Sequence, residues 1–136
     1  MKKSIKINQI LVTVISISIM LTSPIVFAAD DSSIKGALRE KIKTSMMAYI
    51  ETRMVNDTFF IFDAPEGRML NLKFDKLHEG IVKKGNFYVS CADFFDKNGK
   101  KIDLDFLVVK DGDQLKTIQA VVHAVDGNKR KYQLEG

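Results

Sequence analysis

Cysteine and proline are scarce in this sequence, which has one cysteine and two prolines among 136 residues. A single cysteine excludes an internal disulfide scaffold, and 46% hydrophobic residues with so little proline argue against collagen or a disordered chain. Internal repeats and low-complexity stretches are missing after residue 28. The length and composition therefore predict one globular domain, preceded by a short leader.

Motifs of common enzyme and metal-binding classes are also missing. The sequence has no glycine-rich phosphate loop and no Gly-x-Ser-x-Gly turn. His78 begins a zinc-protease-like motif but lacks the second histidine four residues later. Around Gly99, a calcium-loop alignment places Phe94 where the first carboxylate ligand belongs. We therefore predict no catalytic residue, cofactor or metal from motifs, and we lean toward a protein without enzymatic activity.

Residues 1–28 have the three parts of a cleavable signal peptide. A start with three lysines precedes an apolar run at 10–21, which is shorter than the ~18–20 residues of a membrane-spanning helix. Val26 and Ala28 supply the small residues that signal peptidase accepts. We expect a periplasmic or secreted domain of residues 29–136 without membrane attachment after cleavage, the alternative being an uncleaved anchor.

The basic charge belongs mostly to this leader. The chain has 21 basic and 17 acidic residues, but the leader contains three of the basic residues and none of the acidic ones. The rest of the chain therefore carries a formal charge of only about +1. Two short basic runs, at 83–84 and 129–131, have no interleaved aromatic residues. Nucleic acid is therefore not an expected partner.

The hydrophobic period changes near residue 57. Apolar residues spaced three to four apart predict a helix that is capped within Asp30–Ser33 and ends near Asn56. From Thr58 onward, alternating residues and turn signals predict strands instead. The expected strands are 58–62, 70–74, 87–95, 102–108, 115–125 and 129–134, with a short segment at 81–82 as an optional addition.

This order of elements predicts an α+β fold, with one N-terminal helix packed on an antiparallel meander of five or six strands. It resembles the cystatin-like and nuclear-transport-factor-like folds, in which a curved sheet wraps a helix. The cystatin inhibitory loop Gln-x-Val-x-Gly is absent, so the resemblance does not imply protease inhibition. The additional helices of the transport-factor-like group are missing too, which favours the cystatin-like form.

Strand pairing brings several polar residues onto one face of the predicted sheet. A three-residue turn at 111–113 would pair Phe106 with Ile118 on the apolar face. On the opposite face it would place Asp105 beside Gln119 and Asp103 diagonal to His123. We expect Asp103 to favour the charged imidazolium and so to raise the pKa of His123.

The preceding turn adds two more residues to this face. A three-residue turn at 97–99 would set Asp93 opposite Asp103 and Cys91 opposite Asp105. We interpret Cys91 as a small buried hydrophobic residue, the alternatives being an intermolecular disulfide or a functional thiol. The candidate binding face comprises Asp93, Asp103, Asp105, Gln119 and His123.

Several functions fit such a face. We expect a non-enzymatic binding module for an unidentified protein or small ligand. The alternative is an acid–base enzyme whose base, Asp103 or Asp93, lies in a pocket closed by aromatic residues such as Phe59, Phe95 or Tyr88. A metal site of His123, Asp103 and Asp93 is a third possibility, and plain solvation of the outside of the sheet is a fourth.

The leader yields the first testable prediction. Cleavage after Ala28 should give an exported protein that begins at Ala29, because Val26 and Ala28 fit the peptidase sites. Mass spectrometry of the exported protein measures this directly. A mass that starts at Met1 would contradict it.

Overall fold

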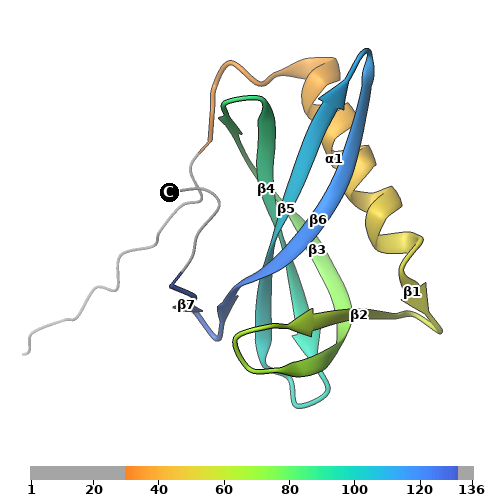
Figure 1. The fold of residues 1–136 in the computed structure, drawn as a ribbon, viewed down its shortest axis with the longest axis vertical. Coiled ribbons are helices and arrows are strands. Elements are labelled where there is room, and N and C mark those ends of the chain that lie inside the picture. The colour runs from red at the N-terminus through yellow and green to blue at the C-terminus, as the bar shows by residue number, and fades with distance from the viewer. Residues whose placement is uncertain (1–29, 132–136) are drawn as a thin grey trace, which may run out of the picture.

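The computed structural model describes residues 30–131, which form one helix and seven strands (Figure 1). The predicted cleavage site and residues 132–134 of the last predicted strand lie outside the described residues. The elements are α1 (Gly36–Glu51), β1 (Met54–Val55), β2 (Thr58–Asp63), β3 (Arg68–Lys84), β4 (Phe87–Asp96), β5 (Lys101–Asp111), β6 (Gln114–Val125) and β7 (Asn128–Lys129).

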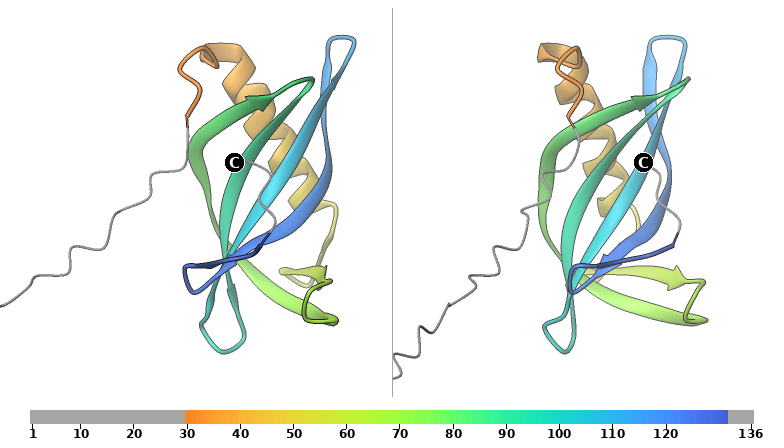
Figure 2. Two further views of the ribbon diagram at one scale, coloured as in Figure 1. Left: turned by 60° about the vertical axis from the view of Figure 1, so that its left-hand side comes forward. Right: turned by 90° about the vertical axis from the view of Figure 1, so that its left-hand side faces the viewer.

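All seven strands form one antiparallel sheet in sequence order, and α1 lies along one face of it beside β5 and β6 (Figures 1 and 2). The α+β prediction is confirmed, but five or six strands was too few. β1 has only two residues, too short for a hydrophobic period to reveal, whereas β7 covers Asn128–Lys129 where a strand at 129–134 was predicted. The predicted strands 70–74 and 81–82 are parts of the single long strand β3.

The helix differs from the prediction at both ends. Its N-cap is Lys35, which makes no side-chain capping hydrogen bond, whereas Asp31 accepts a hydrogen bond from the Ser33 backbone N–H in the preceding turn. The helix ends at Glu51 and not near Asn56. Asn56 does adopt a positive φ of 49°, but it serves a two-residue turn between β1 and β2.

The core lies between α1 and one face of the sheet. Ile42, Met46 and Ile50 of α1 are fully buried, and so are Leu104 and Phe106 of β5. Phe106 therefore lies on the apolar face of the sheet, as the alternation of its strand predicted.

A polar contact also holds the helix to β6. The Ser45 and Thr117 hydroxyl oxygens are 2.9 Å apart, and the Thr117 backbone N–H donates to Ser45 Oγ at 2.6 Å. Thr117 is buried, so this contact supplies hydrogen bonds that water does not.

The segment before α1 is tied to the C-terminal part of β3. The Asp31 N–H donates to the Ile81 carbonyl at 2.8 Å, and the Ile81 N–H donates to Asp30 Oδ1 at 3.1 Å. Arg39 of α1 contacts Asp30 at 2.7 Å and also donates to the Glu79 carbonyl. These contacts fix an irregular part of β3 against the helix.

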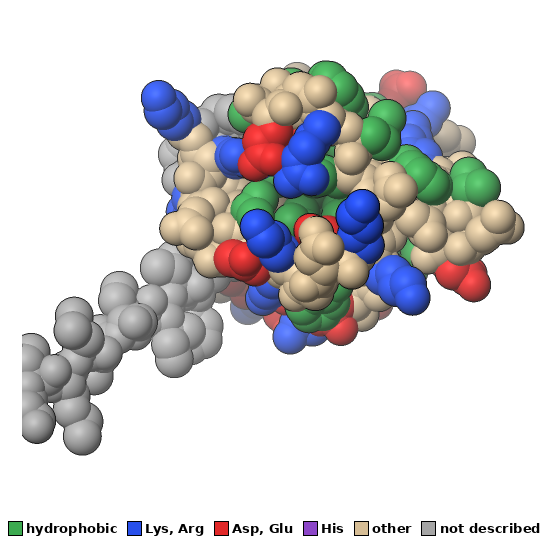
Figure 3. All heavy atoms as spheres, turned by 90° about the horizontal axis from the view of Figure 1, so that it is seen from below, with side chains coloured by type: hydrophobic (Ala, Val, Ile, Leu, Met, Phe, Trp, Pro, Cys, Tyr) green, Lys and Arg blue, Asp and Glu red, His purple; other side chains and the backbone are tan. Residues whose placement is uncertain are grey.

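An apolar groove of about 560 Å³ lies at the far end of the sheet, near the β4–β5 turn. Phe60 and Phe95 line it, each 39% exposed, together with Lys73 and Lys97. Figure 3 views the molecule from below and shows hydrophobic side chains exposed between lysine and arginine side chains. Among the described residues, the helix is neither long nor apolar enough to cross a membrane.

The core assignment predicts unequal costs for three truncations. Leu104→Ala and Phe106→Ala should each lower the free energy of unfolding by ~2–5 kcal/mol, because each leaves a cavity in the core. Lys100→Ala, at an exposed position, should change it by less than about 0.5 kcal/mol. Urea melts measure all three, and equal small losses would contradict the assignment.

Candidate functional site

Polar side chains gather on the sheet face away from α1, which we call the outer face. In β4, Cys91 and Asp93 alternate with Ala92 and Phe94 of the core. The β4–β5 register pairs Asp93 with Asp103 and Cys91 with Asp105, as the three-residue turn predicted. We call the following six residues the outer-face cluster: His78, Cys91, Asp93, Asp103, Asp105 and His123.

Asp93 is buried and surrounded by positive or donating groups. His78 Nε2 lies 2.8 Å from one carboxylate oxygen, and Lys101 Nζ lies 2.9 Å from the other. Burial alone would raise the pKa of Asp93, but the hydrogen bonds from Lys101 and His78 outweigh it. The pKa is therefore held below its usual value, and Asp93 is a charged residue that positions its neighbours.

Asp105 is buried too, and both of its oxygens have partners. The Cys91 thiol donates to Oδ1 at 2.9 Å, and His123 Nδ1 lies 2.8 Å from Oδ2. Cys91 is buried, as predicted. The thiol nevertheless belongs to a polar network, so its interpretation as a plain hydrophobic residue was incomplete.

His123 makes its hydrogen bond with Asp105 and not with the expected Asp103, although the charges of His123 and Asp103 still interact. The turn between β5 and β6 has two residues instead of three, and β6 contains two bulges relative to β5. One bulge falls at His123, because Asp103 pairs with Ala124 while Leu104 pairs with Val122. The extra residue shifts the register, and the imidazole hydrogen-bonds to Asp105 instead of Asp103.

The same shift separates Gln119 from the cluster. Gln119 pairs with Leu107, whereas Asp105 pairs with Val121, so the expected neighbours Asp105 and Gln119 do not pair. Gln119 is exposed. The second bulge places Ile118 at 51% exposure, so the expected pairing of Ile118 with Phe106 was wrong as well.

Asp103 has the least complete hydrogen bonding among the carboxylates of the cluster. Its Oδ1 is buried and has no hydrogen-bond partner among residues 30–131. Burial raises the pKa of Asp103 to about 6. Charges on His78 and His123 oppose this rise, while nearby Asp93 and Asp105 add to it.

His78 is the residue of the cluster that the sequence analysis missed. Leu77 pairs with Ala92 and Ile81 with Ser90, so residues 78–80 of β3 lie opposite Cys91 alone. This irregular stretch turns His78 toward Asp93. The sequence contained one indication of this irregular stretch. Residues 75–80 lack the alternation that is typical of a strand, although strand-like segments flank them.

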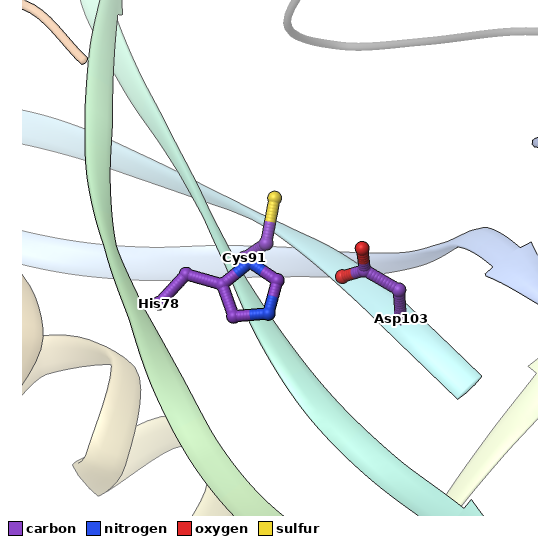
Figure 4. A group of neighbouring side chains, drawn as sticks. All are labelled: His78, Cys91 and Asp103. Atoms are coloured by element: carbon purple, nitrogen blue, oxygen red, sulfur yellow. The ribbon is translucent and has the colours of Figure 1, made fainter. Parts of the chain in front are cut away.

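Three chemically different side chains of the cluster approach one another. Ligand atoms of His78, Cys91 and Asp103 all lie within 4.8 Å of one another. Figure 4 shows them extending from three neighbouring strands toward a common region. They differ from the set of His123, Asp103 and Asp93 that was considered from the sequence.

The aromatic enclosure considered for an enzyme is not the observed arrangement. Phe59 packs in the core with its ring 5.2 Å from the Phe94 ring, and Tyr88 belongs to the same core. Phe95 is on the outer face but is part of the exposed groove. The groups that act on Asp103 are instead the charged side chains of His78, His123, Asp93 and Asp105.

The raised pKa of Asp103 predicts how stability varies with pH. An unfolded aspartate has a pKa near 3.9, so the folded state holds this proton to higher pH. The associated stability is complete below about pH 4 and is lost as the pH rises through about 6. The Asp103→Asn variant cannot ionise at this position, so its free energy of unfolding should not fall in this way. Its stability relative to the wild type should therefore be ~1–3 kcal/mol more favourable above pH 6 than at pH 4.

Urea melts at pH 4 and pH 7.5 test this difference. Asp113→Asn, in the exposed β5–β6 turn, is the matched control and should differ from the wild type by less than about 0.5 kcal/mol at both pH values. A pH-independent difference between Asp103→Asn and the wild type would show that Asp103 does not titrate in this range.

No protein-family model matches this chain, and comparisons with curated proteins and with solved structures returned no match. What the outer-face cluster does must therefore follow from the chemistry of its own residues.

Proposed function

We propose that this protein is an exported, non-enzymatic binding module that holds a cationic ligand at the outer-face cluster. The observation that supports this most is the buried Asp103 Oδ1, which has no hydrogen-bond partner. A buried carboxylate oxygen left without a partner costs free energy. A bound cation would supply the missing interaction.

The charges around Asp103 favour a cation over an anion. Asp93 has Lys101 and His78 as close partners, and Asp105 has His123 and the Cys91 thiol. Asp103 has no comparable partner in contact, yet it lies opposite Asp93 in the β4–β5 ladder. Two carboxylates placed opposite each other attract positive charge.

Export and the finer fold assignment are part of the same proposal. The leader pattern at 1–28 supports a periplasmic or secreted location. One helix on a curved antiparallel sheet supports a cystatin-like arrangement. The near-neutral charge beyond the leader favours a small ligand or a protein partner over nucleic acid.

The alternative function is an acid–base enzyme. The contacts of the cluster favour Asp103 over Asp93 as its general base. Both oxygens of Asp93 are engaged by Lys101 and His78, whereas Asp103 has an oxygen available to accept a proton. A general base takes a proton from its substrate, and this step does not require the substrate to be positively charged. The two functions therefore differ in the charge of the ligand that they require.

Thermal unfolding with a panel of ligands tests the proposal. We expect at least one cation among Zn²⁺, Ca²⁺, Mg²⁺ and spermidine to raise the midpoint of the purified protein by several degrees. A ligand present at 100 times its Kd adds about 2.7 kcal/mol to the free energy of unfolding. The increase should be lost in Asp103→Asn and retained in Asp113→Asn.

Two outcomes would contradict the binding module. Stabilisation by cations that is equal in the wild type and Asp103→Asn would place binding elsewhere. Stabilisation only by an uncharged ligand, such as a cyclic ketone, would favour the enzyme.

A further inference from the structure

We propose that His78, Cys91 and Asp103 form a binding site for a divalent transition-metal ion of the Zn²⁺ class. This inference rests on the proposed function and specifies which cation the outer-face cluster takes. The three residues come from β3, β4 and β5, and their ligand atoms lie within 4.8 Å of one another (Figure 4).

The donor set selects the class of ion. An imidazole nitrogen, a thiolate sulfur and a carboxylate oxygen together suit Zn²⁺ and neighbouring transition metals, whereas Mg²⁺ and Ca²⁺ prefer oxygen ligands alone. One thiolate and one carboxylate also balance the two positive charges of the ion. The occupied site would therefore carry no net charge from these three groups and the ion, and the proton of the Cys91 thiol would be released to solvent on binding.

The hydrogen bonds of His78 prepare its ring for coordination. Asp93 lies 2.8 Å from Nε2 and is itself fixed by Lys101 at 2.9 Å. Histidines that bind metals commonly donate their second ring N–H to a carboxylate, which fixes the tautomer and the ring orientation. With Nε2 bonded to Asp93, Nδ1 is the nitrogen available to the ion.

The other two ligands are positioned by the β4–β5 ladder. Cys91 pairs with Asp105 and Asp93 pairs with Asp103, so Cys91 and Asp103 are diagonal neighbours on the outer face. Asp105 accepts the Cys91 S–H, and its other oxygen is held by His123. Asp103 Oδ1, which has no hydrogen-bond partner, becomes a ligand without breaking an existing bond.

The site needs only a small contraction. Tetrahedral Zn²⁺ with bonds of ~2.0–2.3 Å places its ligand atoms about 3.5 Å apart. The ligand atoms are at most 4.8 Å apart, so side-chain rotations that move them by about 1 Å would bring them to this spacing. Three protein ligands leave a fourth position for water or a further ligand, as in zinc sites that are not fully enclosed by protein.

Co²⁺ absorption tests the thiolate ligand without any substitution. We expect reduced protein titrated with Co²⁺ to develop a thiolate-to-metal charge-transfer band in the near ultraviolet and intense visible bands of tetrahedral Co²⁺. Zn²⁺ should abolish both by competition. The absence of the charge-transfer band would overturn the assignment of Cys91, whatever the variants show.

Zn²⁺ affinity in variants tests the other ligands. His78→Gln, Cys91→Ser and Asp103→Asn should each weaken binding by more than about 100-fold, and Asp93→Asn by about 10-fold or more. Asp113→Asn, in the exposed β5–β6 turn, should bind Zn²⁺ as the wild type does. Circular dichroism of each variant shows whether it is folded, and the Co²⁺ spectrum of the wild type decides the question where a variant is not.

The outcomes separate this inference from the proposed function. If His123→Gln abolishes Zn²⁺ binding while His78→Gln does not, the ligand set is wrong. If Zn²⁺ does not bind but Ca²⁺ or spermidine stabilises the protein through Asp103, the metal site fails and the cation-binding module stands. If no cation binds, both fail.

Discussion

A strand has a side-chain period of two, so strand register decides which residues of this sheet meet. A shift of one residue moves a whole set of side chains from one face to the other. In this sheet, bulges change the register of single strand segments. The irregular stretch of β3 at 78–80 and the bulge of β6 at His123 turn both histidines of the chain toward carboxylates of the outer face.

The three aspartates of the cluster show how burial and partners compete. All three lie on two adjacent strands, yet only Asp93 has a lysine in contact. Asp105 relies on neutral or weakly charged donors, and Asp103 has an oxygen without any partner. Burial raises the pKa of Asp103, whereas hydrogen bonds from Lys101 and His78 hold the pKa of Asp93 below its usual value. Two carboxyls that face each other across one ladder therefore differ in pKa because they differ in hydrogen-bond donors.

The sequence predicted those features of the fold that depend on residues close together along the chain. The turn at 97–99 ends in Gly99 with a φ of 78°, and from that turn the pairing of Asp93 with Asp103 could be derived. The core-facing parity of β5 followed from simple alternation. The β5–β6 register failed because bulges depend on how a strand fits the helix and its neighbours, which local patterns do not contain. His78 was missed for the same reason, since its stretch of β3 is held by Asp30 and Arg39 from outside the strand.

Every strand pairs with the strand that follows it along the chain, and this has a consequence for the order of folding. Hairpins with such short turns close rapidly, because little chain entropy is lost in bringing their strands together. The contacts of α1 with β6 join segments about 70 residues apart, as the Ser45–Thr117 hydrogen bond illustrates with a separation of 72 residues. We expect the sheet to assemble as a series of hairpins and the docking of α1 on β6 to complete the native state.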